Sequence, residues 1–282
     1  MQTIKQKDEL QYLEVSNRLS SIKIAFQGAH IFDFSLQGHK PLLFLSERAH
    51  FKKGKAIRGG IPICWPWFGS HPSNKNLPNH GFARTSLWKH EKTEHISKEK
   101  TKIIMSLKSS KESLALWPYA FELRLEIMMS DILELSLKTK NNSEKAFSLS
   151  QALHTYLQIE DIHTAKIEGL DQRPYYNKLD DSFNNIQEGT LSFSAETDRI
   201  YQELTKPLIL HDKNQDIEVE TVGSDTVVIW NPGQDFAKSF SDLHDYSTFV
   251  CIESANALNS ALRLKKDEVH TLSSFFRVKL HS

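Results

Sequence analysis

The sequence predicts an all-β protein, large and built as a single domain over residues 1–282. Three observations support this prediction. Apolar residues recur at every second position in many short runs, which is the period of a half-buried strand. Turn-forming residues separate consecutive runs, and helical periodicity is confined to two short segments. All-β sandwiches commonly form one unit beyond about 200 residues, so the length fits a single domain.

The alternating runs predict half-buried strands, in chain order, at residues 22–26, 32–36, 103–107, 121–127 and 133–137. Ser130 and Asp131 separate the last two runs, which predicts an antiparallel meander joined by tight turns. Further strands are expected at residues 147–159, 161–170, 226–230, 249–253 and 269–278, and short helices at 111–117 and 239–245. The lysine-rich segment 89–111 is interrupted by glutamates and carries no interleaved aromatics, so we expect a solvated, charged hairpin.

The charge balance argues against polyanionic partners. Lys plus Arg equals Asp plus Glu at 35 each, so the long-range field that attracts nucleic acid or anionic lipid is missing. The two cysteines, Cys64 and Cys251, lie in apolar runs far apart, which fits buried reduced thiols. No run resembles a signal peptide or a membrane span. We therefore expect a soluble, cytoplasmic protein without a nucleic-acid or membrane partner.

Several reaction classes lack sequence support. The chain has no GxxxxGK[ST], no GxGxxG after a strand, no HExxH, no GxSxG and no CxxC. Thirteen histidines are present, but pairs such as His90 and His95 fall in the charged hairpin rather than at metal-ligand spacing. We therefore expect no metal site and no cofactor.

Two passages concentrate unusual chemistry: RGGIPICWPWFG at residues 58–69 and HGFAR at residues 80–84. Their prolines and glycines exclude a regular helix or strand and predict a rigid, aromatic-lined loop. Arg58 and Arg84 stand at the ends of this region and His80 lies between them. A pocket for a small polar anion has such a composition. A packed corner whose arginines face water would have it too.

Two further residues stand out on predicted strands. In the segment around His154, Leu153 and Leu157 share one parity, so His154 faces away from the aliphatic layer beside Tyr156. A lone histidine on a strand is more often structural than functional. Glu253 closes an apolar run, where a partly buried carboxylate is expected. In the segment ETDRIY, Asp198 and Arg199 could form a surface pair, which by itself has no functional meaning.

Taken together, RGGIPICWPWFG, HGFAR, ALHTYL, the YYNK and ETDRIY segments, VVIWNPG and VCIES resemble the hexose-6-phosphate mutarotases, also called glucose-6-phosphate 1-epimerases. These enzymes are a branch of the aldose 1-epimerase superfamily. The resemblance implies a large antiparallel β-supersandwich whose concave face holds the sugar. It also implies interconversion of the α and β anomers of a hexose 6-phosphate, without cofactor. We expect the protein to be a monomer.

By motif position, the resemblance implies a role for six residues. His154 corresponds to the general acid and Glu253 to the general base. Arg58 and Arg84 correspond to basic residues around the phosphate, and His80 and Asp198 to contacts with sugar hydroxyls. Two departures from the family pattern are Gly233, where a second aromatic is usual, and Asn177, where Asp precedes the lysine.

The reaction explains why these residue types suffice. Mutarotation opens a hemiacetal: one proton leaves the C1 hydroxyl, another reaches the ring oxygen, and after rotation about C1–C2 the steps reverse. Because the two protons move at different oxygens, the acid and the base need not touch. Two alternatives stay open at this level: an aldose 1-epimerase of unphosphorylated sugars, and a sugar-phosphate-binding module without catalysis.

Overall fold

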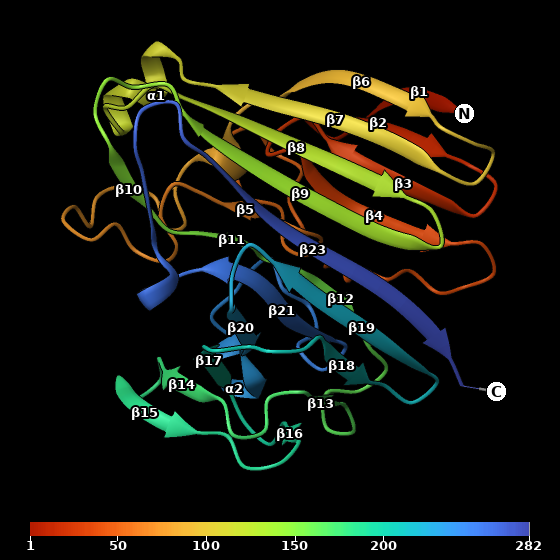
Figure 1. Ribbon diagram of the computed structural model, residues 1–282. Helices are drawn as coiled ribbons and strands as arrows, with labels where there is room; N and C mark the ends of the chain where they lie inside the picture. Colours follow the sequence, from red (N-terminus) through yellow and green to blue (C-terminus); the bar gives the residue numbers. More distant parts are fainter. Residues whose placement is uncertain (282) are drawn as a thin grey trace.

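The computed structural model describes residues 1–281 and is built from four antiparallel sheets (Figure 1). The four-stranded sheet comprises, in order, β1 (Gln2–Lys7), β2 (Leu10–Ser16), β3 (Ser20–Ala25) and β4 (His30–Leu36). A two-stranded sheet pairs β10 (Phe147–Leu149) with β22 (Leu262–Leu264).

The largest sheet has nine strands, several of which lie side by side as a twisted surface in Figure 1. Their order is β16 (Leu191–Ser192), β13 (Lys166–Glu168), β18 (Leu208–His211), β19 (Gln215–Val222), β23 (Val269–Leu280), β9 (Ile132–Asn141), β8 (Phe121–Met129), β7 (Thr101–Lys108) and β6 (Lys89–His95). In β8 and β9 buried and half-buried residues alternate, because one face packs on the core and the other faces solvent.

The eight-stranded sheet positions the site described below. Its order is β15 (Ser182–Ile186), β14 (Pro174–Asn177), β17 (Thr197–Tyr201), β20 (Thr226–Asn231), β21 (Phe249–Asn256), β11 (Gln151–Leu153) and β5 (Ile63–Cys64), with β12 (Tyr156–Gln158) also paired to β21. One face of β20 and β21 contributes Val227, Ile229, Val250 and Ile252 to the main core. The opposite face of these two strands carries Trp230, Cys251 and Glu253. Both faces of β20 and β21 are therefore buried.

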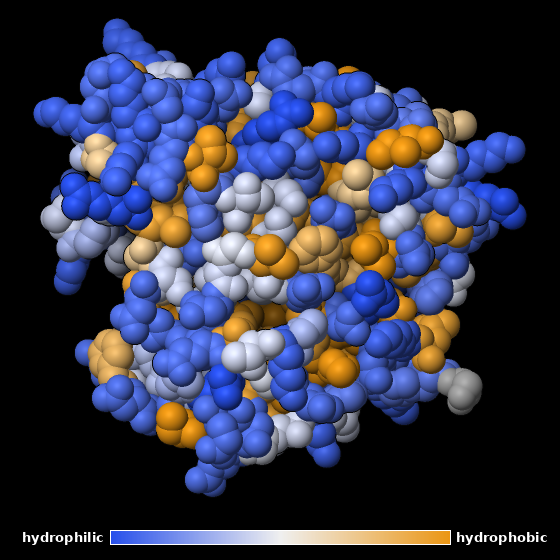
Figure 2. All heavy atoms as spheres, in the orientation of Figure 1, coloured by the Kyte–Doolittle hydropathy of each residue, from blue (hydrophilic) through white to orange (hydrophobic). Residues whose placement is uncertain are grey.

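Helices are few: α1 (Lys111–Leu116), α2 (Gly233–Ala237) and two short 3₁₀ turns at Ala83–Thr85 and Leu258–Ser260. The all-β prediction is confirmed, as are the helix expected at residues 111–117 and the meander of β8 and β9. The charged hairpin forms from β6 and β7, but it is solvated only along β6, because Ile103 and Met105 of β7 are buried in the main core. None of the helices in residues 1–281 is long and apolar enough to cross a membrane. Figure 2 shows a mostly hydrophilic face on which exposed hydrophobic residues are scattered.

The expected helix at residues 239–245 is wrong. That segment consists of turns, and the helix lies earlier, at α2. Tertiary contacts explain the difference: the side chain of Leu243 is buried, and the backbone carbonyl of Asp242 accepts a hydrogen bond of 2.6 Å from Ser46 Oγ. These contacts outweigh a weak local helical preference.

Two expected strands are shorter than predicted. Of residues 161–170, only Lys166–Glu168 form a strand, because Asp161 caps a turn by accepting hydrogen bonds from the amides of Thr164 and Ala165 at its carbonyl. The run 147–159 is divided into β10, β11 and β12. At the first break, the Ser150 amide donates a hydrogen bond to the Pro66 carbonyl, and at the second, the His154 amide donates to the Pro62 carbonyl. The second break is the position of His154.

Candidate active site

A cavity of about 340 Å³ lies on the eight-stranded sheet, on the face opposite the main core. All six residues singled out from the sequence line it: Arg58, His80, Arg84, His154, Asp198 and Glu253. They come from the loops around β5, the break between β11 and β12, and strands β17 and β21. The fold therefore gathers into one cavity residues that are separated by almost 200 positions of the chain.

His154 and Glu253 lie closer together than expected. The distance from His154 Nε2 to Glu253 Oε1 is 3.3 Å, although the reaction does not require contact between acid and base. The pairing of β11 with β21 places Leu153 opposite Ser254 and so brings the neighbouring residues together. Only 8% of His154 and 1% of Glu253 is exposed. His154 Nδ1 and Glu253 Oε2 have no hydrogen-bond partner in the described chain, so both groups have capacity left to bind a polar ligand.

Burial sets the protonation of this pair. It raises the pKa of Glu253 well above its usual value, and the negative charge of Asp198 raises it further. Burial also lowers the pKa of His154 well below its usual value, and the positive charges of nearby Arg84 and Arg58 act in the same direction. Both groups are therefore driven toward their neutral forms, with the proton on the carboxyl group.

Aromatic rings hold the imidazole of His154. The ring of Tyr156 stacks on it, with centroids 4.9 Å apart and an angle of 9° between the planes. The rings of Trp230 and His80 meet it edge-on at 5.9 Å and 5.8 Å. These contacts fix the orientation of the imidazole without using its ring nitrogens, which stay available for proton transfer.

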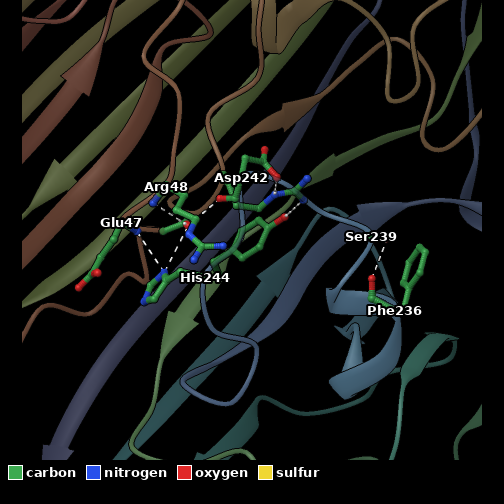
Figure 3. A network of polar contacts seen from close by, with 9 residues as sticks. Glu47, Arg48, Phe236, Ser239, Asp242 and His244 are labelled. Carbon is green, nitrogen blue, oxygen red and sulfur yellow. Dashed lines mark hydrogen bonds and ion pairs between the residues drawn. The ribbon is translucent and has the colours of Figure 1, made fainter.

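Arg58 is fixed by three contacts. Its Nε donates to Asp242 Oδ1 at 3.2 Å, its Nη1 donates to the Tyr156 hydroxyl at 3.2 Å, and its guanidinium lies over the Phe240 ring at 4.5 Å. Figure 3 shows Asp242 in a polar network that also includes His244, whose Nδ1 accepts a hydrogen bond of 3.2 Å from the Glu47 amide. The cation is thus oriented before any ligand binds.

The HGFAR loop holds a second cation at the cavity. Arg84 Nη2 donates to the Asn79 carbonyl at 2.8 Å, and His80 Nδ1 accepts from the Gly69 amide at 3.2 Å. Gly81 has a φ of +71°, and a Cβ there would lie 1.9 Å from the Trp65 carbonyl oxygen, so only glycine fits. Burial lowers the pKa of His80 to about 3, with a further contribution from Arg84, and the ring is therefore neutral.

A model of the aldose 1-epimerase family matches residues 11–277. The chain belongs to the aldose 1-epimerase family. An Escherichia coli (strain K12) protein named "Putative glucose-6-phosphate 1-epimerase" is 34% identical over 272 residues, covering 95% of this chain and 90% of the relative. A Cenchrus ciliaris protein of the same name is 33% identical over 261 residues, covering 87% and 78%. The crystal structure of a "putative mutarotase" from Salmonella typhimurium has a TM-score of 0.92 and 30% identity, covering 99% of this chain and 94% of that one.

In this member of the aldose 1-epimerase family, the aromatic residues of the loop at residues 58–69 line the cavity less than expected. The side chains of Trp65 and Trp67 are buried in the main core, and of the three aromatics only Phe68 lies at the cavity. The peptide bond between Trp65 and Pro66 is cis. The loop is therefore packed into the core on one side and forms a cavity wall on the other, and Arg58 and Arg84 line the cavity rather than face water as in the packed-corner alternative.

Asp198 and Arg199 do not form the surface pair that their adjacency in the sequence allows. Neighbouring residues on a strand point to opposite faces, so Asp198 faces the cavity while Arg199 donates to Gln187 and to the Tyr201 hydroxyl. Asp198 Oδ2 instead accepts a hydrogen bond of 2.6 Å from Lys178 Nζ. Its Oδ1 is buried and has no partner in residues 1–281.

Sequence reasoning missed six lining residues with polar or aromatic side chains: Asn79, Lys178, Trp230, Phe236, Phe240 and Asp242. Lys178 appeared only as part of a departure from the family pattern, and Trp230 only as part of a strand. Phe240 and Asp242 fell in a segment wrongly expected to be helical. Their contribution depends on tertiary contacts that no local pattern reveals.

Proposed function

We propose that this protein interconverts the α and β anomers of a hexose 6-phosphate, with glucose 6-phosphate as the expected substrate. The observation that best supports this proposal is the pair of His154 and Glu253, which lie 3.3 Å apart at a cavity that Arg58 and Arg84 also line. An acid and a base within reach of one sugar ring meet the requirement of hemiacetal opening. Permanently charged guanidinium groups suit a phosphate that is bound but not chemically changed. The names of the relatives agree with this assignment.

In the proposed reaction, Glu253 accepts the proton of the C1 hydroxyl while His154 donates a proton to the ring oxygen. The C1–ring oxygen bond breaks and the open-chain aldehyde forms. Glu253 is then protonated and His154 neutral, which is the combination that burial favours in the free protein. Rotation about C1–C2 and the reverse transfers close the ring as the other anomer. Transfer of the Glu253 proton to His154 across their 3.3 Å contact produces the carboxylate and the imidazolium that ring opening requires, and the negative charge of the bound phosphate favours the imidazolium.

Asp198 and His80 complete the proposed sugar site. Asp198 Oδ1 is a buried acceptor without a partner in the described chain, which a sugar hydroxyl would satisfy. His80 is neutral at physiological pH and still has one ring nitrogen free of the bond to the Gly69 amide. Both therefore suit hydroxyl groups rather than the phosphate.

The proposal is tested by measuring anomer exchange on glucose 6-phosphate, glucose and galactose with NMR exchange spectroscopy. We expect acceleration of glucose 6-phosphate exchange well above acceleration for either free sugar. Acceleration of galactose equal to that of glucose 6-phosphate would favour an epimerase of unphosphorylated sugars. Binding of glucose 6-phosphate without any acceleration would identify a binding module.

Replacing the arginines should separate anchoring from catalysis. Arg58→Ala and Arg84→Ala each remove charged hydrogen bonds to phosphate worth about 1.5–3 kcal/mol, so KM for glucose 6-phosphate should rise roughly 10- to 150-fold. Binding of free glucose should change far less. The exposed Arg18, replaced by alanine, is the matched control and should change neither. Equal losses for both sugars would show that Arg58 and Arg84 are structural only.

A further inference from the structure

A thiol lies beside the proposed proton-transfer pair. Cys251 precedes Glu253 by two positions on β21, so both side chains leave the same face of the strand. One donor atom each from His154, Cys251 and Glu253 lie within 4.8 Å of one another. All three residues are buried. His154 and Glu253 line the cavity, and Cys251 is buried beside them in the cluster that contains Tyr156 and Trp230.

The donor set matches a thiophilic divalent cation. Imidazole nitrogen, thiolate sulfur and carboxylate oxygen are the three ligand types of Zn²⁺, at about 2.0–2.3 Å from the metal. Donors around a tetrahedral ion at these distances lie roughly 3.5 Å apart. His154 Nε2 and Glu253 Oε1 already lie 3.3 Å apart, and the three donor atoms lie within 4.8 Å of one another, so small movements would bring them to these distances. In the described chain, the second carboxylate oxygen of Glu253 and His154 Nδ1 are buried without partners.

We propose that His154, Cys251 and Glu253 form a binding site for Zn²⁺ or a similar thiophilic divalent cation, and that this ion inhibits the enzyme. On binding, the S–H proton of Cys251 passes to solvent and the sulfur lone pair forms the bond to the metal. Three protein ligands leave a fourth position open toward the cavity. The imidazole and the carboxylate become ligands and no longer transfer protons. The inhibition rests on the proposed function, whereas the metal binding does not.

The second cysteine provides a matched control. Cys64 is also free and buried, and it lies on the same sheet, where β5 pairs with β11. It is not part of the group formed by His154, Cys251 and Glu253. Replacing either cysteine by alanine removes one buried sulfur from this sheet, but only Cys251→Ala removes a proposed ligand.

Binding is measured first, without reference to activity. Co²⁺ added to the wild-type protein should give a thiolate-to-cobalt charge-transfer absorption that is absent in Cys251→Ala and retained in Cys64→Ala. Zn²⁺ affinity measured by calorimetry should fall in Cys251→Ala by more than the roughly 10- to 100-fold that loss of an outer-shell partner costs a metal site. Absence of the charge-transfer absorption in the wild-type protein would overturn the proposal, and this result needs no variant to fold.

Inhibition is measured next, with each protein compared with its own metal-free exchange rate. Zn²⁺ should abolish wild-type exchange of glucose 6-phosphate, a chelator should restore it, and Mg²⁺, which prefers oxygen ligands, should have no effect. Resistance to Zn²⁺ should appear in Cys251→Ala and not in Cys64→Ala. Equal sensitivity of both variants would overturn the assignment of Cys251. A wild-type protein that shows the cobalt–thiolate absorption but no metal-free exchange would refute the proposed function and leave the metal site standing.

Discussion

At the scale of single residues, Tyr156 contacts both the proposed acid, His154, and the proposed phosphate-binding residue, Arg58. Its ring stacks on the imidazole of His154, and its hydroxyl accepts a hydrogen bond from Arg58. Burial raises the pKa of Tyr156, so the phenol stays protonated while it accepts this bond. The proposed phosphate anchor and the proposed acid are therefore held by one side chain. We interpret Tyr156 as a positioning residue that acts through His154 and Arg58.

Two substitutions of Tyr156 separate these contacts. Tyr156→Phe keeps the stacked ring and loses only the bond to Arg58, worth about 1 kcal/mol, so KM for glucose 6-phosphate should rise roughly 5-fold with kcat little changed. Tyr156→Leu removes the ring and should lower kcat by about 10-fold or more, because His154 loses its orientation. Steady-state exchange kinetics give both constants. The same effect for both variants would mean that the side chain only fills space.

The turn between β20 and α2 shows what a single element requires. Gly233 has a φ of +62°, and a Cβ there would lie 2.7 Å from the Glu196 backbone nitrogen. Its amide donates to Asn231 Oδ1 at 2.8 Å, which starts the turn. An aromatic residue at this position would be both strained and in collision here. Gly233 thus allows the chain to turn from β20 into α2, where Phe236 lines the cavity.

Gly233→Ala should therefore destabilise the protein more than its φ alone predicts. A left-handed conformation costs a non-glycine residue about 1–2 kcal/mol, and the collision adds to that cost. Gly189 is the matched control, because its φ is +63° and a Cβ added there would meet nothing within 4 Å. Chemical denaturation should give a larger loss in the free energy of unfolding for Gly233→Ala than for Gly189→Ala. Equal losses would mean that the backbone near Glu196 yields without cost.

Strands with apolar alternation were predictable, and the elements shaped by tertiary contacts were not. The runs that became β8 and β9 carry buried residues at every second position, and β20 is a short apolar run buried throughout, so their patterns sufficed. β1 is exposed along its whole length and offers no apolar period. The six site residues could be selected by motif. The 3.3 Å contact between His154 and Glu253 could not, because it depends on the register of β11 against β21.

At the scale of the whole molecule, buried histidines couple folding to pH. His30 on β4 is enclosed behind the RGG turn, and its Nε2–H donates to the Gly59 carbonyl at 2.9 Å. Burial lowers the pKa of His30 to about 3 in the folded protein, against an ordinary value of 6.5. The unfolded chain binds the proton more readily, so the stability from the neutral ring is complete above pH 6.5. It is lost progressively as pH falls toward 3.

His30→Gln should make the stability less sensitive to acid. Below the pKa of the unfolded chain, each buried neutral histidine lowers the free energy of unfolding by up to about 1.4 kcal/mol for every pH unit of acidification. The variant keeps an amide donor for the Gly59 carbonyl, so its slope between about pH 6 and about pH 4, measured by denaturant titration, should be shallower than that of the wild type. Identical slopes would mean that His30 is protonated in the folded protein over this range.

The central claim is that His154 and Glu253 perform the anomer interconversion of a hexose 6-phosphate. The most direct measurement is the α–β exchange rate of glucose 6-phosphate, by NMR, in the wild type and in His154→Gln and Glu253→Gln. We expect each variant to lose roughly 10²- to 10⁴-fold in rate, as for a positioned general acid or base. His90→Gln and Glu94→Gln on the exposed hairpin should keep the wild-type rate. Wild-type exchange in either cavity variant, with the fold intact, would contradict the account.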